Sequence, residues 1–129
     1  MPNPRILVIE DAPTFRSLLV AALRRDYMVS LASEGEEGFQ KALEWNPDAV
    51  VLDHRMEGWD GLRTLQTFRQ HFLLKNVPVI MCTADASRAT VMAALDAGAT
   101  DYMVKSAFVA ETLRLKLERA MQLQGAVRS

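Results

Sequence analysis

Short apolar runs alternate along this chain with stretches in which apolar residues recur every three or four positions. The runs predict five buried strands, at 6–9, 28–32, 49–53, 77–83 and 101–104. The helical spacing predicts five helices after them, with apolar stripes at 15–23, 35–45, 62–72, 91–98 and 107–123. Regular alternation of this kind is typical of a parallel sheet covered by helices on both faces.

Local signals predict where several helices begin and end. Asp11 is a favoured N-cap for the first helix, and Pro13 is tolerated in its first turn. Asn46 and Pro47 end the second helix. Gly98 suits a left-handed terminator of the fourth helix.

The order of the strands follows from connection rules. Right-handed crossovers and five strands favour a flavodoxin-like, doubly wound α/β sheet in the order 2-1-3-4-5. That order puts the second strand at the margin and makes the other four neighbours. Open sheets of this type place their ligand sites at the carboxyl edge of the strands.

Four strands end on polar residues suited to phosphoryl chemistry. Glu10 and Asp11 follow the first strand, Asp53 ends the third, Thr83 ends the fourth, and Lys105 follows the fifth. The predicted strand order brings all five to one edge. Like charges ~4 Å apart repel by about 4 kcal/mol at an effective dielectric of 20, so the three carboxylates call for a cation.

A hard divalent cation fits this acid trio. Mg²⁺ binds through one or two carboxylates and shares phosphate oxygens, and Mn²⁺ is an acceptable substitute. Softer metals are disfavoured because His54, His71 and Cys82 are isolated from one another in the sequence.

With the metal bound, one carboxylate can act as the nucleophile toward a phosphoryl donor. Asp53 is the candidate, because the acid pair lies on one side and Thr83 and Lys105 lie on the other. Lys105 and the metal would neutralise phosphoryl oxygens, and the Thr83 hydroxyl would donate to one of them. The neighbouring Ala84 is small enough to leave room.

The bulk composition adds limits. The chain has 129 residues, the length of one domain, and 50% of them are hydrophobic and 24% charged. Its net charge of −1 gives no overall positive field that would attract nucleic acid. Its single cysteine excludes an intramolecular disulfide. No run reaches the ~20 apolar residues of a membrane span, and no signal peptide is evident. We expect a cytoplasmic single domain spanning 1–129, with a core at 5–123 and a frayed tail from 125.

The chain resembles the response-regulator receiver domains of bacterial two-component signalling, in particular the chemotaxis-regulator type, over residues 5 to about 123. Five motifs in order carry the resemblance: Ile-Leu-Val-Ile-Glu-Asp (6–11), Asp-Ala-Val-Val-Leu-Asp (48–53), Met-Glu-Gly-Trp-Asp-Gly (56–61), Pro-Val-Ile-Met-Cys-Thr-Ala (78–84) and Ala-Leu-Asp-Ala-Gly-Ala-Thr-Asp-Tyr-Met-Val-Lys (94–105).

The resemblance implies a phosphorylation-controlled signalling module rather than an enzyme acting on external substrates. Asp53 would accept a phosphoryl group from the phosphohistidine of a histidine kinase or phosphotransfer protein. Glu10, Asp11, Asp53 and the backbone carbonyl of Arg55 would hold Mg²⁺. A downstream effector protein or a missing output domain would read the result, with no direct role for nucleic acid or membrane.

The resemblance also implies how the signal is switched. Thr83 and Lys105 would contact the phosphoryl oxygens, and Tyr102 would turn inward as Thr83 moves. We expect the fourth helix, fifth strand and fifth helix to form the two-state surface. Arg55 and Asp85 would tune the slow autodephosphorylation.

Two departures from the family pattern are present. Lys105 is followed by Ser106 where the family usually has a proline, commonly in a cis peptide. Met56 is followed by Glu57 where the family usually has Met-Pro, which adds a negative charge but removes no ligand.

Other interpretations compete with this one. Taken singly, Asp11 could be only a cap, Asp53 a solvated turn residue, Thr83 a β-branched strand residue, Lys105 a surface lysine and Tyr102 a half-buried strand residue. A haloacid-dehalogenase-type enzyme would need an aspartate at Arg55. A flavin or dinucleotide site would need glycines or hydroxyls where the acidic segment 10–13 stands. A receiver-like scaffold that is never phosphorylated would not need the complete set of side chains.

Overall fold

The computed structural model describes residues 3–128, with side chains described as far as residue 123. Its five strands are β1 (Arg5–Ile9), β2 (Met28–Ala32), β3 (Ala49–Asp53), β4 (Val79–Thr83) and β5 (Asp101–Val104). Its helices are α1 (Pro13–Leu23), α2 (Gly35–Trp45), α3 (Gly61–Gln70), α4 (Arg88–Asp96), the 3₁₀ turn η1 (Lys105–Ala107) and α5 (Ala110–Arg128). The alternation predicted from the sequence is confirmed.

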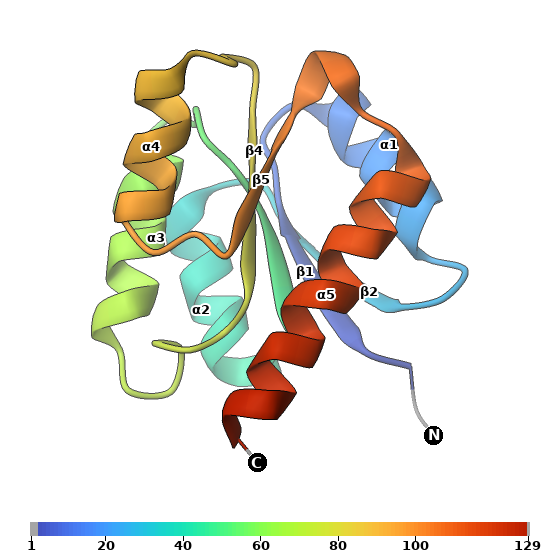
Figure 1. Ribbon diagram of the computed structural model, residues 1–129, viewed down its shortest axis with the longest axis vertical. Helices are drawn as coiled ribbons and strands as arrows, with labels where there is room; N and C mark the ends of the chain where they lie inside the picture. The colour runs from blue at the N-terminus through green and yellow to red at the C-terminus, as the bar shows by residue number, and fades with distance from the viewer. Residues whose placement is uncertain (1–2, 129) are drawn as a thin grey trace.

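The strands form one parallel sheet in the order β2-β1-β3-β4-β5, as predicted. Helices α1 and α5 cover one face, and α2, α3 and α4 cover the other (Figure 1). This is the flavodoxin-like architecture. The order places the carboxyl ends of β1, β3, β4 and β5 side by side along one edge.

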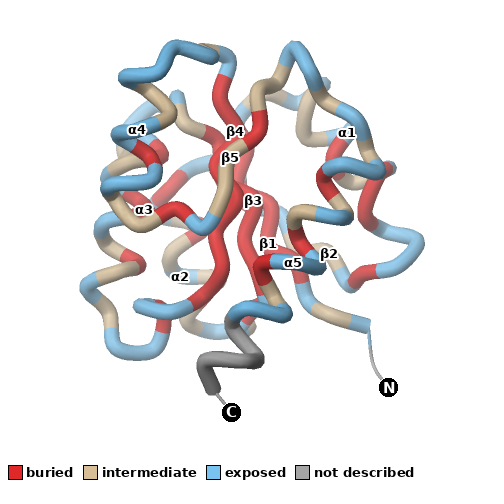
Figure 2. Tube along the Cα trace, viewed as in Figure 1, coloured by how far each residue is buried: buried red, intermediate tan, exposed pale blue. Residues whose placement is uncertain are grey.

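The core consists of two apolar clusters, one on each face of the sheet. Every residue of β3 and β4 is buried, so the interior strands form the continuous buried band in Figure 2. Side chains alternate between the faces, as strand geometry requires: Val51 packs toward α1 and α5, whereas Val50 and Leu52 pack toward α2, α3 and α4. Two-sided burial holds the ends of these strands in fixed positions.

The predicted N-cap of the first helix is wrong. Pro13 is the first residue of α1, so the cap position falls on Ala12, which makes no side-chain capping bond. Asp11 lies one residue too early to cap, and its exposed side chain belongs to the edge of the sheet instead.

The other helix-end signals are confirmed. Asn46 adopts a left-handed conformation with φ 54° and ends α2. Gly98 has φ 105°, a conformation that residues with a Cβ rarely adopt, and it follows the end of α4.

Several element boundaries differ from prediction. Helix α3 ends at Gln70, so Phe72 leaves the predicted apolar stripe and is 75% exposed. Strand β4 begins at Val79 rather than at residue 77. Helix α5 begins at Ala110, because residues 105–107 form the 3₁₀ turn, and it extends to Arg128.

The predicted frayed tail at 125–129 is therefore helical through residue 128, and Ser129 lies outside the described residues. No helix in residues 3–128 is long and apolar enough to cross a bilayer.

We predict that Gly61→Ala lowers the free energy of unfolding by about 2 kcal/mol, as overpacking of a tight contact does. A Cβ on Gly61 would overlap the carbonyl oxygen of Asp53 and lie 2.8 Å from the Cα of His54, and main-chain atoms cannot move aside cheaply. Urea denaturation measures the effect. Gln66→Ala, on the exposed side of α3, is the control and should stay within about 0.5 kcal/mol of the wild type. Equal stability of both variants would contradict the prediction.

Candidate functional site

Three carboxylates converge at the carboxyl edge of the sheet. Glu10 directly follows β1, and Asp53 is the last residue of β3. One oxygen from each of Glu10, Asp11 and Asp53 lies within 4.8 Å of the others. Glu10 and Asp53 are buried, whereas Asp11 is exposed. The structure thus brings together all three acids that the sequence singled out.

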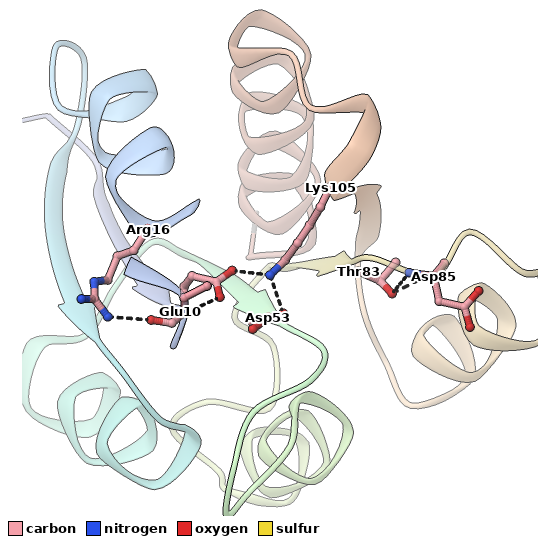
Figure 3. A network of polar contacts seen from close by, with 7 residues as sticks. Glu10, Arg16, Asp53, Thr83, Asp85 and Lys105 are labelled. Atoms are coloured by element: carbon pink, nitrogen blue, oxygen red, sulfur yellow. Dashed lines mark hydrogen bonds and ion pairs between the residues drawn. The ribbon is translucent and has the colours of Figure 1, made fainter. Parts of the chain in front are cut away.

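The Lys105 ammonium bridges two of these acids. Its Nζ lies 2.9 Å from Glu10 Oε1 and 3.0 Å from Asp53 Oδ1. Lys105 begins the turn η1, and its side chain extends from there between the two carboxylates (Figure 3). The ammonium offsets part of the charge repulsion within the cluster.

The Glu10 carboxylate and carbonyl hold the start of α1 in place. Oε2 accepts the Ala12 N–H at 3.0 Å, and the Glu10 carbonyl accepts a bond from Arg16 Nη1 at 3.1 Å (Figure 3). Oε1 is buried, and within the described chain it is held by its ion pair with the Lys105 ammonium.

The surroundings raise the pKa of both Asp53 and Lys105. Burial, reinforced by the Glu10 carboxylate, raises the pKa of Asp53 to about 7, although Lys105 acts against the shift. Burial disfavours the Lys105 ammonium, but its bonds to Glu10 and Asp53 outweigh that effect and raise its pKa. The lysine therefore stays charged, while Asp53 holds its proton more tightly than an exposed aspartate does.

Thr83 reaches the same edge, but its hydroxyl is engaged elsewhere. The hydroxyl donates to the Asp85 carbonyl at 3.2 Å and accepts the Asp85 N–H at 3.0 Å (Figure 3). Its side chain is buried, at 3% exposure. The structure therefore brings Thr83 near the acid cluster without bonding it to Lys105 or Asp53.

The Asp85 side chain fixes the loop between β4 and α4. Its carboxylate accepts the Ser87 N–H at 2.8 Å and the Thr90 hydroxyl at 2.7 Å, and Ser87 in turn caps α4. The bond from the Ser87 backbone, followed by that from Thr90, lowers the pKa of Asp85. Asp85 is thus part of an ordered loop rather than of the acid cluster.

In the described part of the chain, the side chains of the two remaining predicted site residues form no hydrogen bond or ion pair with the three carboxylates. Tyr102 is a half-buried residue of β5, and the Lys116 Nζ lies 5.6 Å from its ring centroid. Arg55 is exposed in the loop after β3, and its charge contributes weakly to the lowered pKa of Asp85, after the hydrogen bonds of that carboxylate.

The donor set fits a magnesium ion. Glu10, Asp11 and Asp53 supply hard oxygen ligands, and the ion pair with Lys105 is the contact that Glu10 Oε1 makes as a buried oxygen. Among residues 3–128, this trio is the one group of three or more acidic, histidine or cysteine side chains close enough to share an ion. Cys82 lies beneath it as a buried thiol whose pKa burial raises to about 12, so it is inert as a ligand.

Sequence reasoning missed two contacts of this site. Phe15 was predicted as part of the core stripe of the first helix, yet its ring lies 4.8 Å from the Lys105 Nζ. Arg16 was not singled out, although it donates to the Glu10 carbonyl. Position in the helical period assigns a face to each residue, but it does not identify the tertiary neighbours of that face.

Comparison with known proteins places this geometry in a family. The family model for the response regulator receiver domain matches residues 6–118. The chain is 38% identical over 122 residues to the transcriptional regulatory protein ResD of Bacillus subtilis, covering 92% of this chain and 50% of ResD. It is 34% identical over 123 residues to the chemotaxis protein CheY-3 of Vibrio cholerae, covering 93% of each. The chain thus spans about half the length of ResD and nearly all of CheY-3.

Solved structures agree with the sequence matches. A putative response regulator from Chloroflexus aurantiacus superposes with a TM-score of 0.89 at 31% identity, covering 93% of this chain and 98% of that one. The receiver domain of the sensor histidine kinase PA1611 from Pseudomonas aeruginosa, solved with a magnesium ion in its active-site cleft, superposes at 0.86 and 30% identity, covering 93% and 98%. The chain therefore belongs to the response-regulator receiver domains of two-component signalling systems.

Proposed function

We propose that this chain is a single receiver domain over 1–129 that accepts a phosphoryl group on Asp53 in a Mg²⁺-dependent reaction. The donor is the phosphohistidine of a histidine kinase or phosphotransfer protein. The observation that carries the proposal is the Lys105 ammonium held 3.0 Å from the Asp53 carboxylate within a cluster of three acids. A lysine and a metal-binding acid cluster around one buried carboxylate suit phosphoryl transfer.

Each side chain has a role in that reaction. Glu10, Asp11, Asp53 and the backbone carbonyl of Arg55 would hold Mg²⁺, which supplies charge neutralisation at the phosphoryl oxygens. An Asp53 oxygen attacks phosphorus, the bond from phosphorus to the donor imidazole nitrogen breaks, and the imidazole leaves with that electron pair. Lys105 orients and neutralises an equatorial oxygen without leaving its position at the cluster.

The switch would begin at Thr83. Its hydroxyl bonds to the Asp85 main chain in this structure, and a phosphoryl group on Asp53 offers a charged acceptor that competes with those neutral bonds. Tyr102 would follow Thr83 and change the surface of α4, β5 and α5. Moving a two-state equilibrium from 1:99 to 99:1 takes about 5.5 kcal/mol of differential stabilisation.

The remaining parts of the proposal concern partners and lifetime. A cytoplasmic kinase or phosphotransfer protein would load the domain, and an effector protein or a linked output domain would read it. ResD, as its name states, is a transcriptional regulator about twice the length of this chain, which supports a linked output as one form of readout. Arg55 and Asp85 would tune the slow loss of phosphate by bordering the path that an attacking water would take.

A scaffold that is never phosphorylated is the alternative. It retains the fold and a partner surface but needs neither a metal nor a reactive carboxylate. The ammonium between Glu10 and Asp53 favours the phosphorylated module, because a scaffold gains nothing from burying those charges together.

We predict that an acyl phosphate such as acetyl phosphate, with Mg²⁺, labels the wild-type protein with one phosphoryl group and that Asp53→Asn abolishes the labelling. The amide is not a nucleophile and is a poor metal ligand, while its shape preserves the fold. Intact-protein mass spectrometry measures the product. Asp96→Asn, which changes an exposed aspartate at the end of α4, is the control and should label as the wild type does.

Two outcomes of that experiment would reject the proposal. Wild-type protein that takes up no label with Mg²⁺ present would favour the scaffold. If Asp53→Asn protein labels at the wild-type rate, a residue other than Asp53 accepts the phosphoryl group.

We predict that Mg²⁺ affinity rises with pH through neutrality. Burial raises the pKa of Asp53 to about 7, so below that pH the metal must displace a proton, and affinity falls by up to roughly tenfold for each further pH unit. Titration calorimetry at about pH 8 and about pH 6 measures the difference. Asp53→Asn protein should bind more weakly and lose this dependence. Equal wild-type affinity at both pH values would contradict the assignment of the metal to Asp53.

Protonation of Asp53 also predicts how the stability of the metal-free protein changes with pH. In the unfolded chain the pKa of Asp53 is near 3.8. Without metal, the folded state therefore binds the proton at Asp53 more tightly than the unfolded chain does. The contribution of Asp53 to stability is therefore greatest below that value and is lost as pH rises through about 7. In thermal melts, the gain in melting temperature from Mg²⁺ should be larger above neutrality than below it.

We predict that Thr83→Ala uncouples labelling from the conformational change. The variant keeps Asp53 and Lys105, so acetyl phosphate should still label it, although more slowly. In the wild type the Tyr102 ring resonances should shift on phosphorylation, and in the variant they should not. NMR spectra recorded before and after phosphorylation measure the Tyr102 shift in the wild type and in the variant. Thr112→Ala, at an exposed position of α5, is the control, and a full Tyr102 shift in Thr83→Ala protein would contradict the prediction.

A further inference from the structure

The Lys105 ammonium has a third neighbour that carries no charge. Its Nζ lies 4.8 Å from the centroid of the Phe15 ring, in addition to its contacts with Glu10 and Asp53. A cation within about 6 Å of a ring centroid is attracted by the ring's electron-rich face, and the attraction grows when water is kept away. The lysine side chain is only 20% exposed, so this contact is shielded from water.

The ring is itself held firmly. Phe15 lies in the first turn of α1, is half-buried, and packs against the core cluster under α1 and α5. Its ring meets that of Phe108 edge-on, with centroids 5.4 Å apart and planes at 74°. Phe108 directly follows η1, so the aromatic pair joins the start of α1 to the short turn that carries Lys105.

The turn offers the lysine little support of its own. The residue after Lys105 is Ser106, the described chain contains no cis peptide bond, and both Ser106 and Ala107 are exposed. Within η1, the Lys105 carbonyl accepts the Phe108 N–H at 3.2 Å. The position of the ammonium therefore depends on what its side chain touches, which is the two acids and the Phe15 ring.

Only the ring contact is independent of the chemistry at the acids. On the proposed function, Mg²⁺ would compete for the oxygens of Glu10 and Asp53, and Asp53 would change from a carboxylate to an acyl phosphate. Both steps weaken or replace the ion pairs that now hold the ammonium. The Phe15 ring binds neither the metal nor the phosphoryl group, so its attraction for the ammonium persists through the reaction.

We propose that Phe15 is a positioning residue for phosphoryl transfer, its ring holding the Lys105 ammonium at Asp53 while the acids are occupied by metal and phosphate. This inference rests on the proposed phosphorylation of Asp53. The competing interpretation is that Phe15 only fills the core. The two interpretations predict different effects of removing the ring. If Phe15 only fills the core, the effect is the same whether or not residue 105 is charged. If Phe15 positions the ammonium, the effect requires the charge of Lys105.

The test uses two substitutions and a neutral background. Phe15→Leu keeps an apolar side chain but removes the ring, and Phe15→Tyr keeps the ring. Lys105→Met keeps the length of the lysine but removes its charge. Leu18→Ala, at an exposed position of α1, controls for general disturbance of that helix. Initial rates of labelling by acetyl phosphate with Mg²⁺ are compared, and urea denaturation verifies that each variant is folded.

In the lysine-containing protein, Phe15→Leu should lower the rate by about 3- to 10-fold, the range expected for a shielded cation–ring contact. Phe15→Tyr and Leu18→Ala should stay within about twofold of the wild type. In the slower Lys105→Met protein, Phe15→Leu should have no further effect. An equal loss from Phe15→Leu in both backgrounds, or an unchanged rate in the lysine-containing protein, would overturn the proposal.

A second readout separates failure of this inference from failure of the proposed function. A ring over the ammonium shifts the NMR signals of the Lys105 ε-methylene group upfield, and Phe15→Leu should remove that shift while Phe15→Tyr retains it. Absence of the shift in wild-type protein would overturn the inference even if labelling occurs. Absence of wild-type labelling would reject phosphorylation of Asp53, and with it the positioning role, even if the shift is present.

Discussion

The site is organised by the ion pairs of one ammonium with two buried carboxylates. Glu10 and Asp53 are buried at adjacent strand ends, where their mutual repulsion is poorly screened, and Lys105 lies 2.9 and 3.0 Å from them. One ammonium cannot neutralise two ionised carboxylates, and Asp11 adds a further negative charge at the rim. A cluster that is short of positive charge suits a divalent cation, and burial together with the Glu10 carboxylate raises the pKa of Asp53.

The sheet tolerates this concentration of charge because packing on both faces holds its interior strands in place. Strands β3 and β4 are buried along their whole length, so the position of Asp53 is set by apolar packing on both faces. The loop beyond Asp53 is held close by Gly61, whose backbone N–H donates to the His54 carbonyl at 2.7 Å. Stability is therefore supplied by residues away from the edge, and the edge itself can carry groups that repel one another.

Lys105 and Thr83, on the two sides of Asp53, differ in what holds them. Lys105 is fixed by charges and by an aromatic ring, while Thr83 is fixed by hydrogen bonds to the main chain of Asp85. Asp85 is itself secured by Ser87 and Thr90 at the start of α4. A change in charge at Asp53 would act on both sides at once: it would alter the ion pair with Lys105, and through Thr83 it would reach the loop that leads to α4.

The sequence alone determined the order of the elements and the identity of the polar strand ends, because strand and helix periods are local properties and crossover rules leave few sheet orders. It was enough to place Glu10, Asp11, Asp53, Thr83 and Lys105 along one edge. It did not determine which of them touch: Thr83 bonds to Asp85 instead of joining the cluster, Asp11 does not cap α1, and Phe15 meets Lys105. Those outcomes depend on distances between segments far apart in the chain, and tertiary packing alone sets such distances.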